Sequence, residues 1–168
     1  MSDNNSLYLK SLSSPLGKIY LTSDGVNLTG LYYADEVKEL NGEEKDLSVF
    51  KMTKAWLTVY FHGKEPSFTP PLKLTGTVFQ KQVYEYILSI PYGKRVSYGQ
   101  VAEAIAGKRG LRKMSAQAIG QALKANKISI IVPCHRIIKN DGSLGGYGGG
   151  TKRKIFLLEL ESQGKSLI

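Results

Sequence analysis

Apolar and polar positions follow a strand-like pattern over two short stretches near the start of the chain, residues 16–22 and 28–33. The pattern predicts two strands. Between them, residues 23–25 read Ser-Asp-Gly, a turn signal that favours an antiparallel hairpin. Residues 1–10 are polar, and we expect them to be loose at the start of the chain.

The pattern changes to helical spacing between residues 50 and 61, where Phe50, Trp56 and Tyr60 are among the recurring apolar positions. This spacing predicts an amphipathic helix. The acidic and polar residues 35–47 before it are expected to form a surface loop or a short helix. We interpret His62, which follows the helix, as a surface residue rather than a metal ligand.

Helical spacing also dominates the second half of the chain. Ser97 and Ser115 are suited to cap two of its helices, and Gly107 is expected to end the first of these. Two short helices followed by a β element resemble a helix-turn-helix of the winged type. The helices that we expect cover residues 77–89, 98–105, 116–125 and 151–162.

Three prolines between residues 66 and 71 mark an extended linker, and the charge changes sign there. Residues 1–72 carry seven Lys or Arg and nine Asp or Glu, a net of −2, and residues 73–168 carry sixteen and five, a net of +11, which together give the formal +9. We therefore predict two domains, 1–72 and 73–168. A basic second domain favours a polyanionic partner, the alternative being a basic surface that serves solubility.

The expected helix 116–125 has one polar face and otherwise small residues. Gln117, Gln121 and Lys124 share the polar face, while Ala116 and Gly120 are among the small positions. Such a helix could enter a DNA groove closely, with its polar stripe facing phosphates. Close packing against a neighbouring helix is the alternative.

Composition disfavours several classes of protein. One cysteine allows no internal disulfide, which suits a reducing cytoplasm, and one cysteine with two histidines excludes a four-ligand zinc site. We therefore expect a cytoplasmic protein with no metal and no cofactor. No apolar run has the length of a membrane span, and the first ten residues do not resemble a secretory signal, so we expect no membrane association.

The one cysteine, Cys134, follows the apolar run 130–132 and Pro133. We predict that residues 130–132 form a short buried strand that ends at Pro133, because proline cannot donate to a ladder and restricts the residue before it. Cys134 would then be held where regular structure stops. A lone cysteine beside an apolar strand is commonly a small buried hydrophobe, and the adjacent His135 alone does not distinguish a reactive one.

Residues 144–150 are rich in glycine around Tyr147, so backbone groups can approach a flat ligand closely. A flexible surface loop is the alternative. The apolar helix that we expect after it must be well buried. It contains Glu159 and Glu161, and an inward carboxylate would need a partner, but periodicity does not choose between the two.

The segment Pro133-Cys134-His135-Arg136 closely resembles the active-site signature of the O6-alkylguanine-DNA alkyltransferases, the methylated-DNA–protein-cysteine methyltransferases. The resemblance covers about residues 79–161. It implies an α/β (α+β) fold with an N-terminal RNase H-like small antiparallel sheet with helix and a C-terminal winged-helix-like domain with a helix-turn-helix. The other matching motifs are Ser97-Tyr98-Gly99-Gln100, the Ala-x-Ala-Ile-Gly helix, Asn126, the Gly-Tyr-Gly-Gly loop, the Leu-Leu-Glu-Leu-Glu helix and, in the N-terminal half, Ser14-Pro15-Leu16-Gly17.

The resemblance implies DNA repair by direct damage reversal. A monomer would bind double-stranded DNA that contains O6-alkylguanine, flip the base out, and move its alkyl group irreversibly to Cys134; O4-alkylthymine would be a second substrate. His135 would take the thiol proton through a water, Glu161 would orient His135, and Tyr98 would donate towards the departing base.

Further site residues are implied by their positions in the family's motifs. Asn126 and Arg136 match residues that hold the active-site turn together. The residues implied to bind substrate are Asn126, Arg136, Ile137, Tyr147 and Gly148. The residues implied to contact DNA are Ser97, Gln100, Arg112, Lys113, Ala116, Gln117, Gly120, Gln121 and Lys124.

Gln117 departs from the family, because many relatives carry an arginine there that fills the gap left by the flipped base. Glutamine is shorter and uncharged, so we predict weaker base extrusion, partly offset by the basic residues of segment 108–113.

Two other functions remain open, a non-catalytic winged-helix regulator or lesion sensor and a hydrolase that uses Cys134 with His135. A stable adduct on Cys134 separates the alkyltransferase from both.

Overall fold

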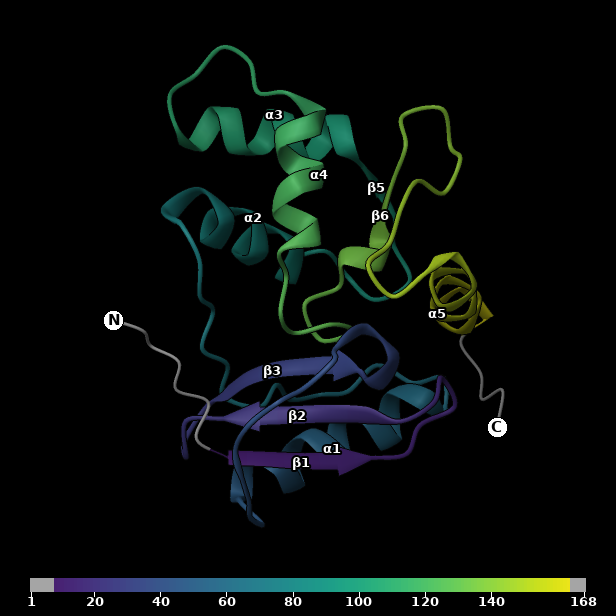
Figure 1. Cartoon of the computed structure of the whole chain (residues 1–168). Helices are drawn as coiled ribbons and strands as arrows, with labels where there is room; N and C mark the ends of the chain where they lie inside the picture. Colours follow the sequence, from purple (N-terminus) through teal and green to yellow (C-terminus); the bar gives the residue numbers. More distant parts are fainter. Residues whose placement is uncertain (1–7, 164–168) are drawn as a thin grey trace. The chain divides into compact units, whose positions relative to one another are not determined.

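The computed structural model describes residues 8–163, which divide into two compact units (Figure 1). Within this range the first unit contains residues 8–73, 127–129 and 163, and the second contains residues 74–126 and 130–162. Each unit has its own sheet and its own helices.

The first unit is built on a four-stranded sheet with the strand order β3-β2-β1-β4. β1 (Tyr8–Leu12), β2 (Ile19–Ser23) and β3 (Leu28–Tyr33) pair antiparallel. The two-residue β4 (Glu43–Glu44) lies parallel to β1, and a short 3-10 helix, η1 (Ala34–Glu36), follows β3.

The predicted hairpin is confirmed as β2 and β3. Ile19 lies opposite Tyr33 and Leu21 opposite Leu31, and all four side chains are fully buried. The prediction of a loose start is wrong for residues 8–10, which lie in β1. No residue of β1 is fully buried, so apolar burial contributes little to this strand. Backbone hydrogen bonding to β2 holds the strand in place instead.

α1 (Ser48–Phe61) packs against β2 and β3, and the predicted amphipathic helix is confirmed. Phe50, Leu57 and Tyr60 are among its buried residues, and their spacing places them on one face. His62 is exposed just after the helix, with its Nδ1 2.7 Å from the Thr58 carbonyl oxygen, as expected for a helix-terminal surface residue.

The free edge of β3 is covered by a later part of the chain. Leu31 N–H donates to the Lys127 carbonyl at 2.8 Å, and Ser129 N–H donates to the Leu31 carbonyl at 3.1 Å. Residues 127–129 therefore belong to the first unit, although the segments on both sides of them belong to the second. These hydrogen bonds pair backbone groups of the edge strand that could otherwise bind the edge of another chain.

The second unit is mainly helical, with three helices packed against one another and a fourth that follows the glycine-rich loop. A short parallel pair joins β5 (Val96–Ser97) to β6 (Ile137–Ile138). The helices are α2 (Val78–Leu88), α3 (Tyr98–Lys108), α4 (Ala116–Lys124) and α5 (Thr151–Gln163).

Both predicted serine caps are confirmed. Ser97 Oγ accepts a hydrogen bond from Gln100 N–H at 3.1 Å, and Ser115 Oγ accepts one from Ala118 N–H at 3.0 Å. Gln100 Oε1 also accepts from Ser97 N–H at 2.9 Å, which completes a capping box at the start of α3. Two helices that contribute to the site therefore have fixed beginnings.

The helix α3 extends past Gly107, so the expectation that this glycine ends the helix is wrong. The chain leaves the helix at Gly110, which has φ 67°. Gly110 N–H donates to the Gly107 carbonyl at 3.2 Å and Leu111 N–H to the Ala106 carbonyl at 2.8 Å. These two bonds form a Schellman motif, which needs the left-handed residue that Gly110 supplies.

The predicted strand over residues 130–132 is also wrong, because the chain turns there. Ile130 has φ 70°, a left-handed conformation that strands exclude and that a β-branched residue rarely adopts. Such a conformation costs on the order of 1–3 kcal/mol, and the side chain is almost completely buried. The apolar run is buried as predicted, but it packs as a strained turn that leads to the cysteine.

Candidate active site

Cys134 begins the 3-10 helix η2 (Cys134–Arg136), immediately after Pro133. Pro133 has φ −81° and ψ 66°, and Cys134 N–H donates to the Val132 carbonyl at 2.8 Å. This is an inverse γ-turn, one of the tightest ways to redirect a chain. The cysteine is only 8% exposed, so the turn holds the side chain inside the second unit.

The thiol is held between the end of α4 and its own turn. Asn126 Nδ2 donates to Cys134 Sγ at 3.1 Å and to the Val132 carbonyl at 3.2 Å. Cys134 Sγ lies 3.8 Å from the Leu123 carbonyl, to which the thiol donates. Burial raises the pKa of Cys134 to about 12, against the lowering effects of the Asn126 hydrogen bond and the charge of Lys154. The resting sulfur is therefore a protonated thiol and needs a base.

Three buried ionisable side chains form a cluster, and two of them, His135 and Arg136, directly follow Cys134 in the sequence. His135 Nε2 lies 2.7 Å from Glu161 Oε2, and Arg136 donates to both carboxylate oxygens of Glu161, at 2.8 and 3.1 Å. Arg136 also donates to the Ile90 carbonyl at 2.7 Å, and Gly93 N–H donates to Glu161 Oε1 at 3.1 Å. Glu161 is thus the inward carboxylate of α5 and has the partners that burial requires.

The protonation states in this cluster follow from its partners. Burial would raise the pKa of Glu161, but the hydrogen bonds from His135 and Arg136 and the positive charge of Arg136 lower it to about 2, so it is a carboxylate at neutral pH. Burial lowers the pKa of His135 and outweighs the raising effect of Glu161, so His135 is neutral. A carboxylate cannot donate, so Nε2 of His135 carries the proton and the basic lone pair lies on Nδ1.

Tyr98 contacts the glycine-rich loop. Burial raises the pKa of its hydroxyl, and a hydrogen bond from Gly146 N–H partly opposes this. Gly145 has φ 73°, and a Cβ on it would lie 3.1–3.2 Å from the Tyr98 ring and hydroxyl, so this position requires glycine. Tyr147, in the same loop, meets the His135 ring edge-on with centroids 6.3 Å apart.

An open pocket of about 520 Å³ lies beside Tyr98. Three predicted DNA-contacting residues of α4 line this pocket together with the glycine-rich loop. Residues 139–141 also line it, although the sequence analysis did not predict them as site residues. Cys134 itself is not among the residues that line this pocket. Its lining is Tyr98, Ala116, Gln117, Gly120, Lys139, Asn140, Asp141, Gly145 and Gly146.

The remaining predicted DNA-contacting residues fall into two groups. Ser97 and Gln100 use their side chains in the capping box of α3. The others are exposed, and Gly148 of the loop is exposed as well. The exposed predicted contacts outside the pocket are Arg112, Lys113, Gln121 and Lys124.

Sequence reasoning missed Lys154, which is fully buried in α5. Its Nζ donates to the carbonyls of Ile137 at 2.6 Å, Leu144 at 2.5 Å and Gly146 at 3.1 Å. Apolar residues lie nearly all round this helix, so periodicity does not select its buried face. In the structure, Lys154 and Glu161 are both on that buried face.

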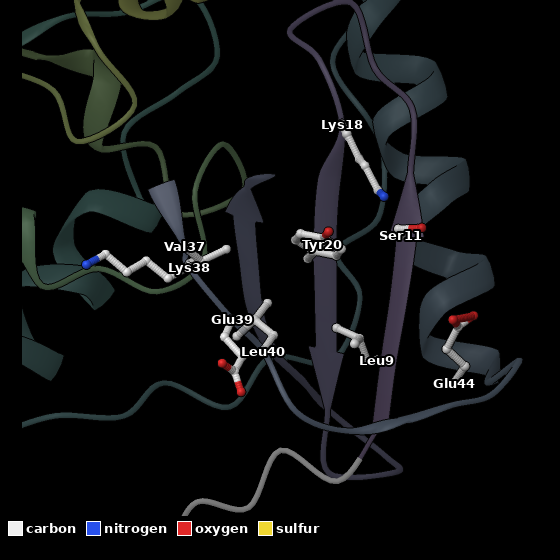
Figure 2. A pocket seen from close by; sticks show the side chains of 9 residues that line it. All are labelled: Leu9, Ser11, Lys18, Tyr20, Val37, Lys38, Glu39, Leu40 and Glu44. Carbon is white, nitrogen blue, oxygen red and sulfur yellow. The ribbon is translucent and has the colours of Figure 1, made fainter. Parts of the chain in front are cut away.

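A second pocket, of about 380 Å³, lies in the first unit (Figure 2). Leu9, Tyr20 and Leu40 supply apolar surface, and Lys18, Glu39 and Glu44 are among its charged residues. Lys18 Nζ lies 5.2 Å from the centre of the Tyr20 ring. None of its lining residues is a cysteine or a histidine, so the candidate site is the cluster around Cys134.

Within residues 8–163, no group of three or more His, Cys, Asp and Glu side chains is placed to share a metal ion. No helix in this range is long and apolar enough to cross a membrane.

Comparison with known proteins gives one consistent family. Residues 7–74 match "6-O-methylguanine DNA methyltransferase, ribonuclease-like domain", and residues 78–163 match "6-O-methylguanine DNA methyltransferase, DNA binding domain". The methylated-DNA–protein-cysteine methyltransferase of Mycobacterium leprae is 41% identical over 157 residues, 92% of each chain. The constitutive enzyme of Bacillus subtilis is 35% identical over 161 residues, 92% of this chain and 94% of its own.

A solved structure agrees with these sequence matches. The Mycobacterium tuberculosis OGT, crystallised in complex with DNA, matches with a TM-score of 0.85 and 37% identity over 96% of each chain. This agreement confirms the predicted mixed α/β class, with a small N-terminal sheet and a helical C-terminal part. The chain therefore belongs to the 6-O-methylguanine DNA methyltransferase family, also called the methylated-DNA–protein-cysteine methyltransferases.

Proposed function

We propose that this protein repairs DNA by transferring the alkyl group of O6-alkylguanine, and of O4-alkylthymine, to Cys134 in a single irreversible turnover. The observation that carries the proposal is the buried cysteine that stands directly before a histidine held by a carboxylate, His135 to Glu161 at 2.7 Å. The same base-plus-orienter arrangement activates nucleophiles in many enzymes. Homologues named for transfer from methylated DNA to a protein cysteine support it.

DNA binding is supported by the charge of the second half and by the relative crystallised with DNA. Residues 73–168 carry a net of +11, from sixteen Lys or Arg and five Asp or Glu. Ala116, Gln117 and Gly120 of α4 line the pocket beside Tyr98, and small residues let a helix approach a groove closely. In this proposal, a base flipped from the duplex passes this pocket on its way to Cys134, which does not line it, and Gln117 takes the place of the flipped base in the stack.

The reaction balances with the groups at hand. The Cys134 thiol gives its proton to His135, through a water, and the sulfur forms a bond with the alkyl carbon. The bond between that carbon and guanine O6 breaks, and its electron pair stays on the guanine. Tyr98 donates its hydroxyl proton to the guanine, and the proton taken by His135 restores the tyrosine. The products are a thioether on Cys134 and unmodified guanine.

The neutral state of His135 suits it for this role. A base must be unprotonated to accept the thiol proton, and burial holds the pKa of His135 below its ordinary value. Glu161 orients the ring and stabilises the imidazolium that forms, as in a catalytic triad. We further propose that Asn126 and Arg136 hold the turn, that the protein acts as a monomer, and that it works in the cytoplasm, where the thiol stays reduced.

Intact-protein mass spectrometry tests the proposal. Incubation with a duplex oligonucleotide that carries one O6-methylguanine should add one methyl group per molecule, mapped to Cys134 by peptide sequencing. Cys134→Ser should gain none while still binding the duplex. A wild-type protein that binds the duplex and gains no methyl group would support the regulator or sensor instead, and an adduct that disappears with time would support the hydrolase.

A further inference from the structure

The connector between α3 and α4, residues 109–115, carries a leucine among basic side chains. Leu111 is 48% exposed, and Lys108, Arg112 and Lys113, which lie close to it in the sequence, are exposed as well. A single exposed leucine is ordinary on a protein surface, so its support and its surroundings decide whether it has a role.

The backbone holds Leu111 at a defined place beyond the end of α3. Gly110 is the left-handed residue of the Schellman motif, and Leu111 N–H donates to the Ala106 carbonyl at 2.8 Å. In this motif, the residue at the position of Leu111 commonly packs its side chain on the last turn of the helix. Here Ala106 is almost completely buried, whereas Leu111 keeps about half of its surface exposed. The motif therefore fixes the leucine without covering it.

Side chains hold both ends of the connector. Arg109 Nη1 donates to Gln82 Oε1 of α2 at 2.9 Å, and the Arg109 guanidinium lies 5.5 Å from the centre of the Phe79 ring. At the other end, Ser115 Oγ caps α4. Because the connector is already held, a partner that binds Leu111 has little ordering of this segment to offset.

The charges around Leu111 fit a polyanion. Residues 104–126 contain five Lys or Arg and no Asp or Glu. None of the ion pairs within residues 8–163 involves Lys108, Arg112 or Lys113, so these cations are available to a partner. One leucine is too small an apolar surface to hold a protein on a membrane. The partner that matches this surface is therefore duplex DNA, whose phosphates lie on either side of apolar sugar edges.

The position of the connector suits a contact away from the damaged base. It leads from the end of α3 to the start of α4 (Figure 1). Tyr98 begins α3 and Lys108 ends it, ten residues later, which places the connector about 15 Å from Tyr98 along the helix. Ala116 and Gln117, which directly follow the connector, line the pocket beside Tyr98. A duplex that meets the start of α4 would therefore meet the connector as well.

We infer that Leu111 packs against the deoxyribose edges of bound duplex DNA, about four base pairs from the flipped base, while the cations beside it contact the phosphates. The inference rests on the proposed function and adds an apolar contact that is remote from the lesion. A contact of this kind displaces no counterions, so its contribution to affinity does not depend on salt, whereas that of a phosphate contact does.

The test is equilibrium binding to a fluorescein-labelled duplex without a lesion, measured by fluorescence anisotropy over a range of salt concentrations. Leu111→Ser removes the apolar contact, Leu111→Met keeps an apolar side chain, and Arg112→Gln removes one cation. Val26→Ser is the matched control, because Val26 is an exposed apolar residue between β2 and β3 of the first unit. Urea unfolding checks that each variant is folded.

We expect Leu111→Ser to weaken binding by about three- to tenfold at every salt concentration, because burying the exposed half of a leucine contributes that much to affinity. Leu111→Met and Val26→Ser should bind like wild type within about twofold. Arg112→Gln should lower the slope of log affinity against log salt concentration by about one, and Leu111→Ser should leave this slope unchanged.

Equal affinities of Leu111→Ser and Val26→Ser for the duplex would overturn the inference. It would also be overturned if Leu111→Met lost as much affinity as Leu111→Ser, because the shape of the turn and not the apolar contact would then be responsible. A salt slope that changes in Leu111→Ser as it does in Arg112→Gln would contradict it as well. Wild-type protein that binds the duplex and transfers no methyl group from O6-methylguanine would instead contradict the proposed function, so the two failures are distinguishable.

Discussion

The two units bury different kinds of polar group. In the described part of the first unit, the buried polar side chains are the hydroxyl residues Thr22, Ser23 and Thr53, and each hydroxyl has a hydrogen-bond partner. In the described part of the second unit, the buried polar side chains are all ionisable: His135, Arg136, Lys154 and Glu161.

The difference separates a unit built for stability from one built for chemistry. A buried hydroxyl with a partner costs little, whereas each buried ion carries a desolvation penalty of several kcal/mol that its partners must offset. Buried ionisable groups with perturbed pKa values gather at functional sites. All four of these groups lie in η2 or on one face of α5, so the cost is confined to the elements that surround the thiol.

Among the variants that test this comparison, we expect Glu161→Gln to have the largest effect on stability. It leaves Arg136 buried without a carboxylate, and breaking a buried ion pair costs about 3–5 kcal/mol of unfolding free energy. Glu159→Gln is the matched control, since Glu159 is exposed on the same helix and should change stability by less than about 0.5 kcal/mol. Urea unfolding of wild type, Glu161→Gln and Glu159→Gln measures both changes in unfolding free energy. Equal midpoints for the three proteins would contradict the account.

Acid should affect the second unit in two steps. The pKa of His135 is held below 6.5 in the fold, so the unfolded chain takes up a proton first and stability begins to fall as the pH drops below 6.5. The pKa of Glu161 is lowered from 4.5 to about 2, so its contribution is present above 4.5 and is lost as the pH falls from there towards about 2. Urea midpoints against pH measure this, and the lower step should be absent in Glu161→Gln.

The smallest effect is expected from Gln117→Arg, which changes the proposed DNA interface without touching the buried cluster. An arginine can stack in the gap left by a flipped base, and a cation–π contact of about 0.5–1 kcal/mol corresponds to a two- to fivefold faster transfer. Gln121→Arg adds the same charge to the same helix and should not reproduce the gain at saturating protein. Unchanged transfer rates for Gln117→Arg would show that the glutamine does not limit base extrusion.

The sequence predicts the parts of this molecule that local chemistry determines. Serine residues that precede helically spaced apolar residues predict the starts of α3 and α4. The apolar patterns predict β2, β3 and α1. The resemblance of Pro133-Cys134-His135-Arg136 to the signature of a known family predicts the position of the proposed nucleophile, which these residues alone do not distinguish from a buried hydrophobe.

The misses have physical reasons of a different kind. The apolar run before Cys134 has strand composition, but Ile130 adopts a left-handed conformation that only its tertiary surroundings impose. A lysine in a helix is usually exposed, so Lys154 reads as a surface residue until its three carbonyl acceptors are known. Those acceptors lie outside α5, on segments that the fold places beside it, so the composition of the helix does not reveal them.

The central claim is that His135, held by Glu161, takes the proton of the Cys134 thiol. The most direct measurement is the single-turnover rate of methyl transfer from an O6-methylguanine duplex by Glu161→Gln, per folded molecule, beside Glu159→Gln. We expect Glu161→Gln to be slower by about 10²–10⁴-fold, the usual contribution of a positioned base, with the methyl group still on Cys134. Equal rates for the two variants would contradict the claim and would leave the buried cluster as a structural element alone.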